Sequence, residues 1–192
     1  MNDAHLDLLA SEDWRAMLRD LILPFAFGSM PVTDLGSNVL EIGPGPGLTT
    51  DLLVEDAERL MAVELDPGLA RALADRYDDS DRVVVVEGDA TAMTFADGEF
   101  TGAVSFTMLH HVPDIAKQDL LFAEVCRVLQ TGAPFVCSDS VASDDLEALH
   151  AEDVYNPVDP AGLEARLLSA GFTSVEVRTN EFAFAARAER TG

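Results

Sequence analysis

The amino-acid sequence predicts an α/β fold in which a doubly wound, mostly parallel sheet of seven strands ends in an antiparallel hairpin. From Val39 onward, five apolar runs of strand length alternate with amphipathic helical patterns, which is typical of a parallel sheet covered on both faces. Two further runs near the end of the chain are separated by little more than Asn180. So short a connection can only join antiparallel strands.

The residues before this alternation predict a short helical lead-in. Apolar residues recur there at helical spacing, namely Trp14, Leu18, Leu21 and Ile22. Ser11 suits the N-cap of this helix, and Pro24 is expected to end it. The 192 residues suit one domain with its own core. We therefore expect a single domain over 1–192, with a lead-in over 1–35 and a core over 36–192.

The elements of the core follow in order. Strands are expected over residues 38–42, 59–64, 82–87, 102–106, 134–138, 172–179 and 181–187. Helices are expected over 48–56, 68–77 and 117–129, and a last one from Asp159-Pro160 to Ala170-Gly171. Asp66 and Pro67 supply a cap and a proline at the first helical position of the second of these helices.

Charge and composition exclude several classes of protein. The chain carries 35 acidic and 12 basic residues, a net charge of −23, which opposes binding to phosphate backbones, so no nucleic-acid partner is expected. Lys117 is the only lysine, a halophile-like pattern that a GC-rich genome would also produce. No apolar run approaches membrane-spanning length and no secretory signal is visible, which predicts a cytoplasmic protein without membrane association. Cys126 and Cys137 lack CxxC spacing, so no metal site is expected.

The loop after the first strand carries glycines at 43, 45 and 47. Such a loop lets backbone approach a ligand and delivers that ligand to a helix N-terminus. The dinucleotide fingerprint GxGxxG would need its third glycine where Leu48 stands, which disfavours NAD. Glu64 ends the second strand, where a carboxylate can accept bonds from both ribose hydroxyls. Asp89, after the third strand, could meet an adenine amino group.

With these motifs the chain resembles the class I S-adenosylmethionine-dependent methyltransferases, in particular the small-molecule, methyltransferase type 11-like branch. The resemblance implies a Rossmann-like sheet whose last strand lies between the fifth and sixth, and a product, S-adenosylhomocysteine, left in the site. It also implies the cofactor contacts. Gly43, Gly45 and Gly47 would wrap the methionine part of the cofactor, with Glu41 beneath it, and Thr107 and Met108 would lie beside the methionyl group. Glu64 would hold the ribose. Leu65 would lie beside the adenine, and Asp89 and Ala90 would meet the amino edge of the adenine.

The histidines after the fourth strand are candidate bases. A hydroxyl or ammonium acceptor must lose a proton, and His110 or His111 is well matched to take it near neutral pH, whereas a carbon acceptor needs less help. The alternative is that one histidine only packs or caps while the other lines the pocket without taking a proton. In the same way, Glu41 could bond loop N–H groups and Asp89 could be a turn residue.

The acidic stretch over 139–158 is a candidate acceptor region. His150, Glu152, Asp153 and Tyr155 either contact substrate or form a solvated face. Because this insert and the lead-in are short, we expect an open acceptor site or one completed by a partner subunit, as in a homodimer. The expected function is methyl transfer to a small molecule. The alternatives are an inactive S-adenosylmethionine-binding interaction protein and an NAD-dependent oxidoreductase.

Overall fold

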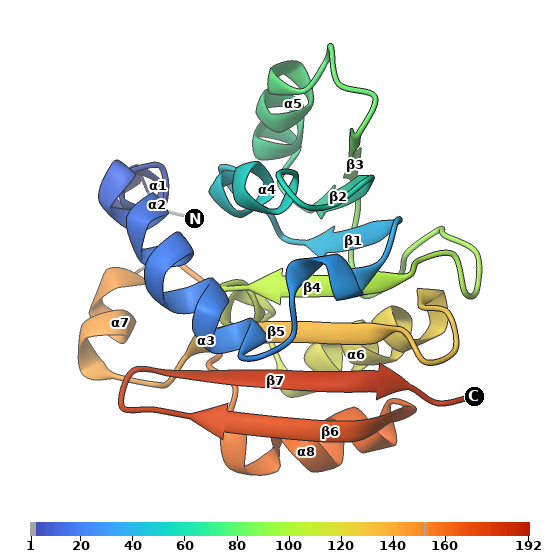
Figure 1. The fold of residues 1–192 in the computed structure, drawn as a ribbon. Coiled ribbons are helices and arrows are strands. Elements are labelled where there is room, and N and C mark those ends of the chain that lie inside the picture. Colours follow the sequence, from blue (N-terminus) through green and yellow to red (C-terminus); the bar gives the residue numbers. More distant parts are fainter. Residues whose placement is uncertain (1–2, 152) are drawn as a thin grey trace.

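The computed structural model describes residues 3–151 and 153–192 and has the predicted α/β architecture (Figure 1). Its seven-stranded sheet has the order β3-β2-β1-β4-β5-β7-β6. Strand β7 runs antiparallel to both of its neighbours, and every other pairing is parallel. The strands are β1 (Val39–Ile42), β2 (Leu60–Glu64), β3 (Val83–Glu87), β4 (Gly102–Phe106), β5 (Pro134–Ser140), β6 (Phe172–Thr179) and β7 (Ala183–Arg190).

Helices cover both faces of this sheet. In Figure 1, α3 lies in front of the strands while α6 and α8 lie behind them. The helical segments are α1 (Asp3–Leu9), α2 (Glu12–Met17), η1 (Leu18–Ile22), α3 (Leu23–Phe27), η2 (Val32–Leu35), α4 (Leu48–Leu53), α5 (Pro67–Arg76), η3 (Leu109–His111), α6 (Ile115–Val128), α7 (Asp144–Leu149) and α8 (Pro160–Ser169).

Two apolar cores flank the sheet because successive strand residues point to opposite faces. In β1, Leu40 and Ile42 belong to the core under α6 and α8, whereas Val39 belongs to the core under α3 and α4. All four residues of β1 and all five of β4 are buried. The central strands thus hold their C-terminal ends rigidly, and these ends carry the residues of the candidate site.

The lead-in confirms one local prediction and corrects another. Ser11 is the N-cap of α2, where its hydroxyl accepts a hydrogen bond from the N–H of Trp14. Pro24 was expected to end the helix, but the chain stays helical to Phe27. The π-helical segment η1 ends two residues before this proline, and its widened turn accommodates a residue that has no N–H to donate. Gly28 ends the helix instead, with φ of 60°.

Helix α7 was not predicted. Ser143 caps it by accepting a hydrogen bond from the N–H of Leu146, and the first turn carries Asp144, Asp145 and Glu147, which interact favourably with a helix N-terminus. These residues had been interpreted only as part of an acidic stretch. Glu152 lies outside the described residues. No helix in the described part of the chain has the length and apolar character needed to cross a membrane.

Candidate functional site

A cavity of about 450 Å³ opens at the C-terminal edge of the sheet. It lies where the strand order reverses, because β1 is followed by β2 and β3 on one side and by β4 and β5 on the other, and open α/β sheets bind ligands at such a point. Four strand ends contribute to its wall: Gly43, Pro44, Gly45 and Pro46 after β1; Glu64 at the end of β2 with Leu65 and Asp66 after it; Gly88, Asp89 and Ala90 after β3; and Thr107, Met108 and His111 after β4.

The glycine loop places two of its three glycines in the cavity wall. Gly43, with φ of 65°, lies so close to Met108 that an added Cβ would be 2.2 Å from the Cγ of that side chain. Gly45 faces open space. Gly47 does not line the cavity; it starts α4, and a Cβ there would be 2.3 Å from Leu73 on α5. The third glycine therefore permits close helix packing rather than ligand approach.

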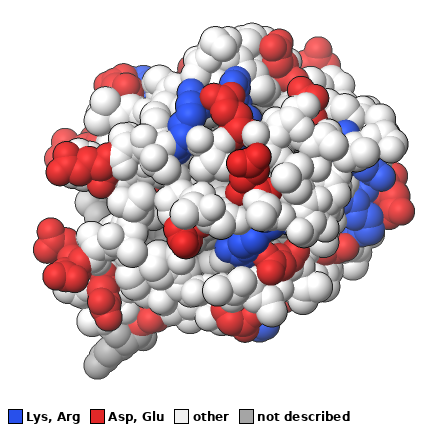
Figure 2. Space-filling model, turned by 90° about the horizontal axis from the view of Figure 1, so that it is seen from below, with Lys and Arg blue, Asp and Glu red and all other residues white. Residues whose placement is uncertain are grey.

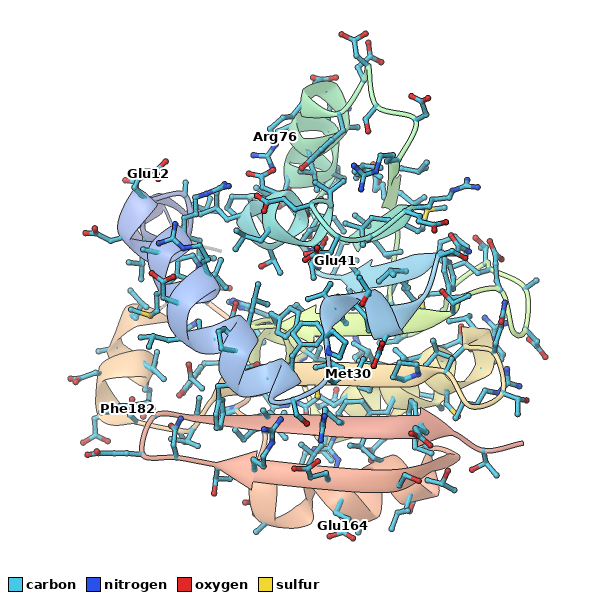
Figure 3. All side chains as sticks on the ribbon, in the orientation of Figure 1. Glu12, Met30, Glu41, Arg76, Glu164 and Phe182 are labelled. Carbon is cyan, nitrogen blue, oxygen red and sulfur yellow. The ribbon has the colours of Figure 1, made fainter. Side chains whose placement is uncertain are left out.

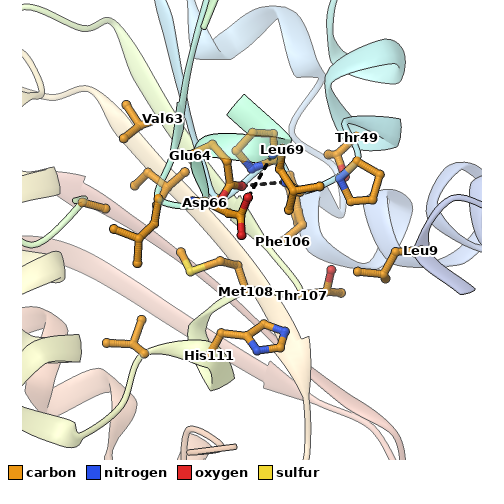
Figure 4. Close-up of a pocket in the computed structure, with 18 of the residues that line it drawn as sticks. Leu9, Thr49, Val63, Glu64, Asp66, Leu69, Phe106, Thr107, Met108 and His111 are labelled. Atoms are coloured by element: carbon orange, nitrogen blue, oxygen red, sulfur yellow. Dashed lines mark hydrogen bonds between the residues drawn. The ribbon is translucent and has the colours of Figure 1, made fainter. Parts of the chain in front are cut away.

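Glu64, the last residue of β2, places a carboxylate beside the glycine loop. Its side chain is 7% exposed. One carboxylate oxygen accepts a hydrogen bond from the N–H of Gly45 at 3.0 Å, and the other accepts from the N–H of Asp66 at 2.9 Å (Figure 4). A carboxylate can accept about four hydrogen bonds, so both oxygens can still accept from ligand hydroxyls. The loop and the end of β2 thus hold this carboxylate at the cavity surface.

Glu41 does not line the cavity. It lies buried between β1 and α4 (Figure 3), where one carboxylate oxygen accepts a hydrogen bond from the Thr50 hydroxyl at 2.7 Å. Burial, with a smaller contribution from the nearby carboxylates of Asp51 and Glu64, raises the pKa of Glu41 to about 8. The structure therefore places this predicted cofactor residue outside the cavity wall, in a polar contact with the following helix.

The remaining residues predicted to contact the adenine line the same cavity. Leu65 is largely exposed, and Ala90 lines the same cavity. Asp89 also lines it, while its carboxylate accepts two hydrogen bonds from Thr91, one from the N–H and one from the hydroxyl. These bonds lower the pKa of Asp89. Asp89 is thus both a turn residue and a wall residue.

Thr107 and Met108 follow β4 and lie between Glu64 and His111 in the view of Figure 4. Thr107 has a φ of 51°, in the left-handed region that residues other than glycine rarely adopt. Its N–H donates to the carbonyl of Ser138 in β5. Backbone strain of this kind persists only where the surroundings enforce it, and it gathers at functional sites. The loop after β4 is held in place by the neighbouring strand.

The two candidate bases differ in position. His111 lines the cavity, whereas His110 is buried behind it. Asp139, which is 1% exposed in β5, accepts a hydrogen bond from the backbone N–H of His110 at 3.0 Å, and its other oxygen lies 2.7 Å from Nδ1 of the same residue. Sequence reasoning missed Asp139. The one signal was a carboxylate at the end of an apolar strand, 29 residues from its partner.

The lead-in and the acidic stretch complete the opposite side. Leu9, Trp14 and Leu18 line the cavity, and an ion pair of 3.3 Å from Arg15 to Asp51 ties α2 to α4. These apolar residues were not identified as site residues, because their helical spacing is equally typical of plain core packing. The acidic stretch contributes Asp153 and Val154 to the cavity wall.

His150 and Tyr155 lie beside the cavity rather than in its wall. The two rings stack at a centroid distance of 4.7 Å, and His150 is buried. The N–H of Asn156 donates to the carbonyl of His110 at 2.7 Å, which fastens this segment to the loop after β4. The structure thus gathers histidines that are forty residues apart in the sequence.

Comparisons with known proteins agree with this arrangement. The model of the family described as "Methyltransferase domain" matches residues 40–137, just over half of the chain. The "Probable ribosomal RNA small subunit methyltransferase A" of Haloarcula marismortui is 46% identical over 72 residues, which cover 36% of this chain and 25% of that protein. The chain therefore spans about a quarter of the length of this relative.

Two solved structures share the fold over nearly the whole chain. The protein in complex with the Haloferax volcanii Trm112 methyltransferase activator has a TM-score of 0.73 at 16% identity, with 97% of this chain and 98% of that one covered. Phosphoethanolamine N-methyltransferase 2 of Haemonchus contortus, solved with S-adenosyl-L-methionine, has a TM-score of 0.74 at 16% identity, covering 91% of this chain and 52% of that one. The chain belongs to the methyltransferase domain family.

Proposed function

We propose that this methyltransferase transfers its methyl group to a small molecule bound at the histidine end of the cavity. The observation that carries the proposal is that one cavity of about 450 Å³ joins the Glu64 carboxylate and His111. That volume lies within the range of small-molecule sites. When bound, the cofactor supplies a methyl group on a sulfonium, which passes by in-line displacement to a nucleophile held close to it.

The cofactor fits the groups at the end of the cavity that holds the glycine loop and Glu64, which we call the cofactor end. Glu64 can accept hydrogen bonds from the ribose hydroxyls while it keeps its bonds to the glycine loop. Gly43 and Gly45 let the methionine part approach the backbone. Leu65 and Ala90 offer apolar contact to the adenine, with Asp89 at its amino edge. Thr107 and Met108 would flank the methionyl group, and Glu41 and Gly47 support the loop from below.

The acceptor would occupy the histidine end of the cavity, which is therefore also the acceptor end. Trp14 and Leu18 add apolar groups to the cavity wall and help to exclude water. His111 faces the cavity and is the residue we propose takes a proton from an acceptor hydroxyl or amine. His110 would act behind it as a positioning residue, because Asp139 fixes its ring. A carbon acceptor would not need this proton transfer.

The charge favours a small acceptor over RNA. Although the curated relative named above is a ribosomal RNA methyltransferase, this chain carries a net charge of −23. In Figure 2, the basic side chains of the face viewed stand in small groups beside acidic ones rather than in a continuous patch. Nine arginines bond to carboxylates or carbonyls of the chain itself: Arg15, Arg19, Arg76, Arg82, Arg127, Arg166, Arg178, Arg187 and Arg190. Phosphate binding by counterion release needs basic groups that are available.

A two-part assay tests the acceptor class. The enzyme is supplied with radiolabelled S-adenosylmethionine and either a panel of small hydroxyl and amine metabolites or protein-free small-subunit ribosomal RNA. Label transferred to a small molecule alone supports the proposal. Label transferred to the RNA alone contradicts it. Size measurement of the same preparation tests two further parts of the proposal, that the chain acts as a single domain and that a homodimer completes the acceptor end.

A further inference from the structure

Three histidines from two distant segments meet beside the cavity. His110 and His111 follow β4, and His150 follows α7. One ring nitrogen of each lies within 4.8 Å of those of the other two. The ring centroid of His110 lies 4.2 Å from that of His111 and 4.8 Å from that of His150. Gathering three imidazoles in a largely buried place is characteristic of a metal site.

Hydrogen bonds fix which nitrogen two of these rings present. The Nδ1 of His110 lies 2.7 Å from a carboxylate oxygen of Asp139, and the Nδ1 of His150 lies 2.6 Å from the carbonyl oxygen of Leu146. Both oxygens can only accept, so Nδ1 is the donor in each ring, and Nε2 is the nitrogen through which the neutral imidazole can bind a metal ion. Metal-binding histidines are oriented in the same way, by a carboxylate or carbonyl that holds the other ring nitrogen.

We propose that His110, His111 and His150 bind one borderline divalent cation, such as Zn²⁺, through three imidazole nitrogens. Imidazole suits Zn²⁺ and neighbouring transition metals, whereas Mg²⁺ and Ca²⁺ select oxygen ligands. Tetrahedral ligands at about 2.0–2.1 Å from zinc lie about 3.3 Å from one another. The three nitrogens, now within 4.8 Å, therefore close by about 1.5 Å at most, which small rotations of the side chains supply.

The catalytic role of the cation site rests on the proposed function, whereas metal binding by the three histidines does not. A site with three histidine ligands keeps its fourth position open. Because His111 also lines the cavity, an acceptor hydroxyl bound there takes that position through its oxygen. The metal ion lowers the pKa of the bound hydroxyl; the O–H proton leaves to water, the oxygen bonds to the methyl carbon, and sulfur keeps the electron pair of the broken C–S bond. In this form the metal ion replaces His111 as the group that promotes proton loss.

Sequence reasoning expected no metal site because it searched for cysteine spacing. The ligand set here combines adjacent histidines with a third one forty residues later, and no short motif encodes that spacing. Only α7 and the segment after it bring His150 to the pair. Leu146, which orients the ring of His150, lies in α7, whereas Asp139, which orients the ring of His110, lies in β5.

The test is metal binding by the full chain after dialysis against a chelator. We expect ZnCl₂ titrated against a chromophoric competitor to bind at one equivalent per chain, and CoCl₂ to give the visible absorption bands of tetrahedral Co²⁺. His150→Ala and the more conservative His150→Gln should each weaken binding at least tenfold. Cys126→Ala, which removes a thiol remote from the cluster, should bind as the parent does. Circular dichroism checks that each variant is folded.

Two results would overturn the proposal: no stoichiometric binding of either ion, or undiminished binding in folded His150→Gln. A titration with S-adenosylhomocysteine in the same preparations separates the two proposals. If that ligand binds and zinc does not, only the metal site is refuted. If zinc binds and the nucleoside does not, the cofactor site is refuted while the metal site stands.

Discussion

The two ends of the cavity differ in how the chain builds them. The cofactor end comes from the loops after β1, β2 and β3, each of which follows a recognisable strand, so each polar group sits at a predictable place on one sheet edge. The histidine end combines the loop after β4 with β5 and the residue that follows α7, and its contacts join residues up to about forty positions apart. Local strand order therefore specifies the first end, and tertiary packing specifies the second.

His111→Ala gives the largest effect that separates the ends. Because His111 lines the acceptor end, turnover of an acceptor hydroxyl or amine should fall by about 10²- to 10⁴-fold, the range for losing a general base. Affinity for S-adenosylhomocysteine should stay within about twofold, since the cofactor end is untouched. Steady-state kinetics and calorimetry measure the two quantities. Unchanged turnover in a folded variant would remove His111 from the reaction.

Glu41→Gln should alter how stability depends on pH. Burial raises the folded-state pKa of Glu41 from 4.5 to about 8, so the folded protein holds this proton more tightly than the unfolded chain does. The contribution is fully present below about pH 4.5 and is lost as pH rises to 8, at up to about 1.4 kcal/mol per pH unit. The glutamine stays neutral, so the variant should gain stability relative to the parent between pH 5 and 8.

Urea unfolding at several pH values measures that difference. Exposed Glu58→Gln is the matched control, and it should follow the parent across the same window. A parallel pH dependence for Glu41→Gln and the parent would mean that Glu41 is ionised in the folded protein. The glycine loop would then rest on a buried charge instead of a neutral hydrogen-bonding group.

Glu64→Ala tests the cofactor end directly. Losing hydrogen bonds to a charged group costs about 1.5–3 kcal/mol, so affinity for S-adenosylhomocysteine should fall by roughly 10- to 100-fold. Glu87 is its register partner in β3 and is exposed outside the cavity wall. Glu87→Ala should bind as the parent does. Equal affinities for the two variants would exclude Glu64 from the site.

Asp139→Asn gives the smallest effect and sharpens the comparison. An asparagine offers one acceptor oxygen where Asp139 now serves both the N–H and the Nδ1 of His110. We expect about tenfold losses in turnover and in zinc affinity, as is usual when a group that orients a metal ligand is removed, with no change in S-adenosylhomocysteine affinity. Ser138→Ala in the same strand controls for disturbance of β5. A change in cofactor affinity alone would contradict the assigned positions.

The sequence predicted the fold well because its signals are local. Apolar runs and caps such as Asp66, whose carboxylate accepts from the N–H groups of Gly68 and Leu69, are readable one segment at a time. Pro24 was misinterpreted because the preceding π-helical turn depends on packing rather than on composition. Helix α7 was missed because its acidic residues equally suit a solvated loop.

The residues of the candidate site show the same difference between local signals and contacts formed only in the folded chain. Glu64, Gly43 and Gly45 follow from their places at strand ends, and the structure brings them to one cavity. Gly47 and Glu41 belong to the same motif but lie outside the cavity wall. The motif alone does not distinguish a residue that contacts the ligand from one that packs against a helix. Asp139 and Trp14 reach the site only through contacts between distant segments, which a single sequence does not reveal.

Calorimetric titration of the purified chain with S-adenosylhomocysteine and, separately, with NAD tests the central claim most directly. The account predicts micromolar binding of S-adenosylhomocysteine at one site per chain and no binding of NAD, because the loop lacks the third glycine of the dinucleotide fingerprint. Binding of NAD, or of neither ligand, would contradict the claim that the glycine loop and Glu64 form the cofactor end of this cavity.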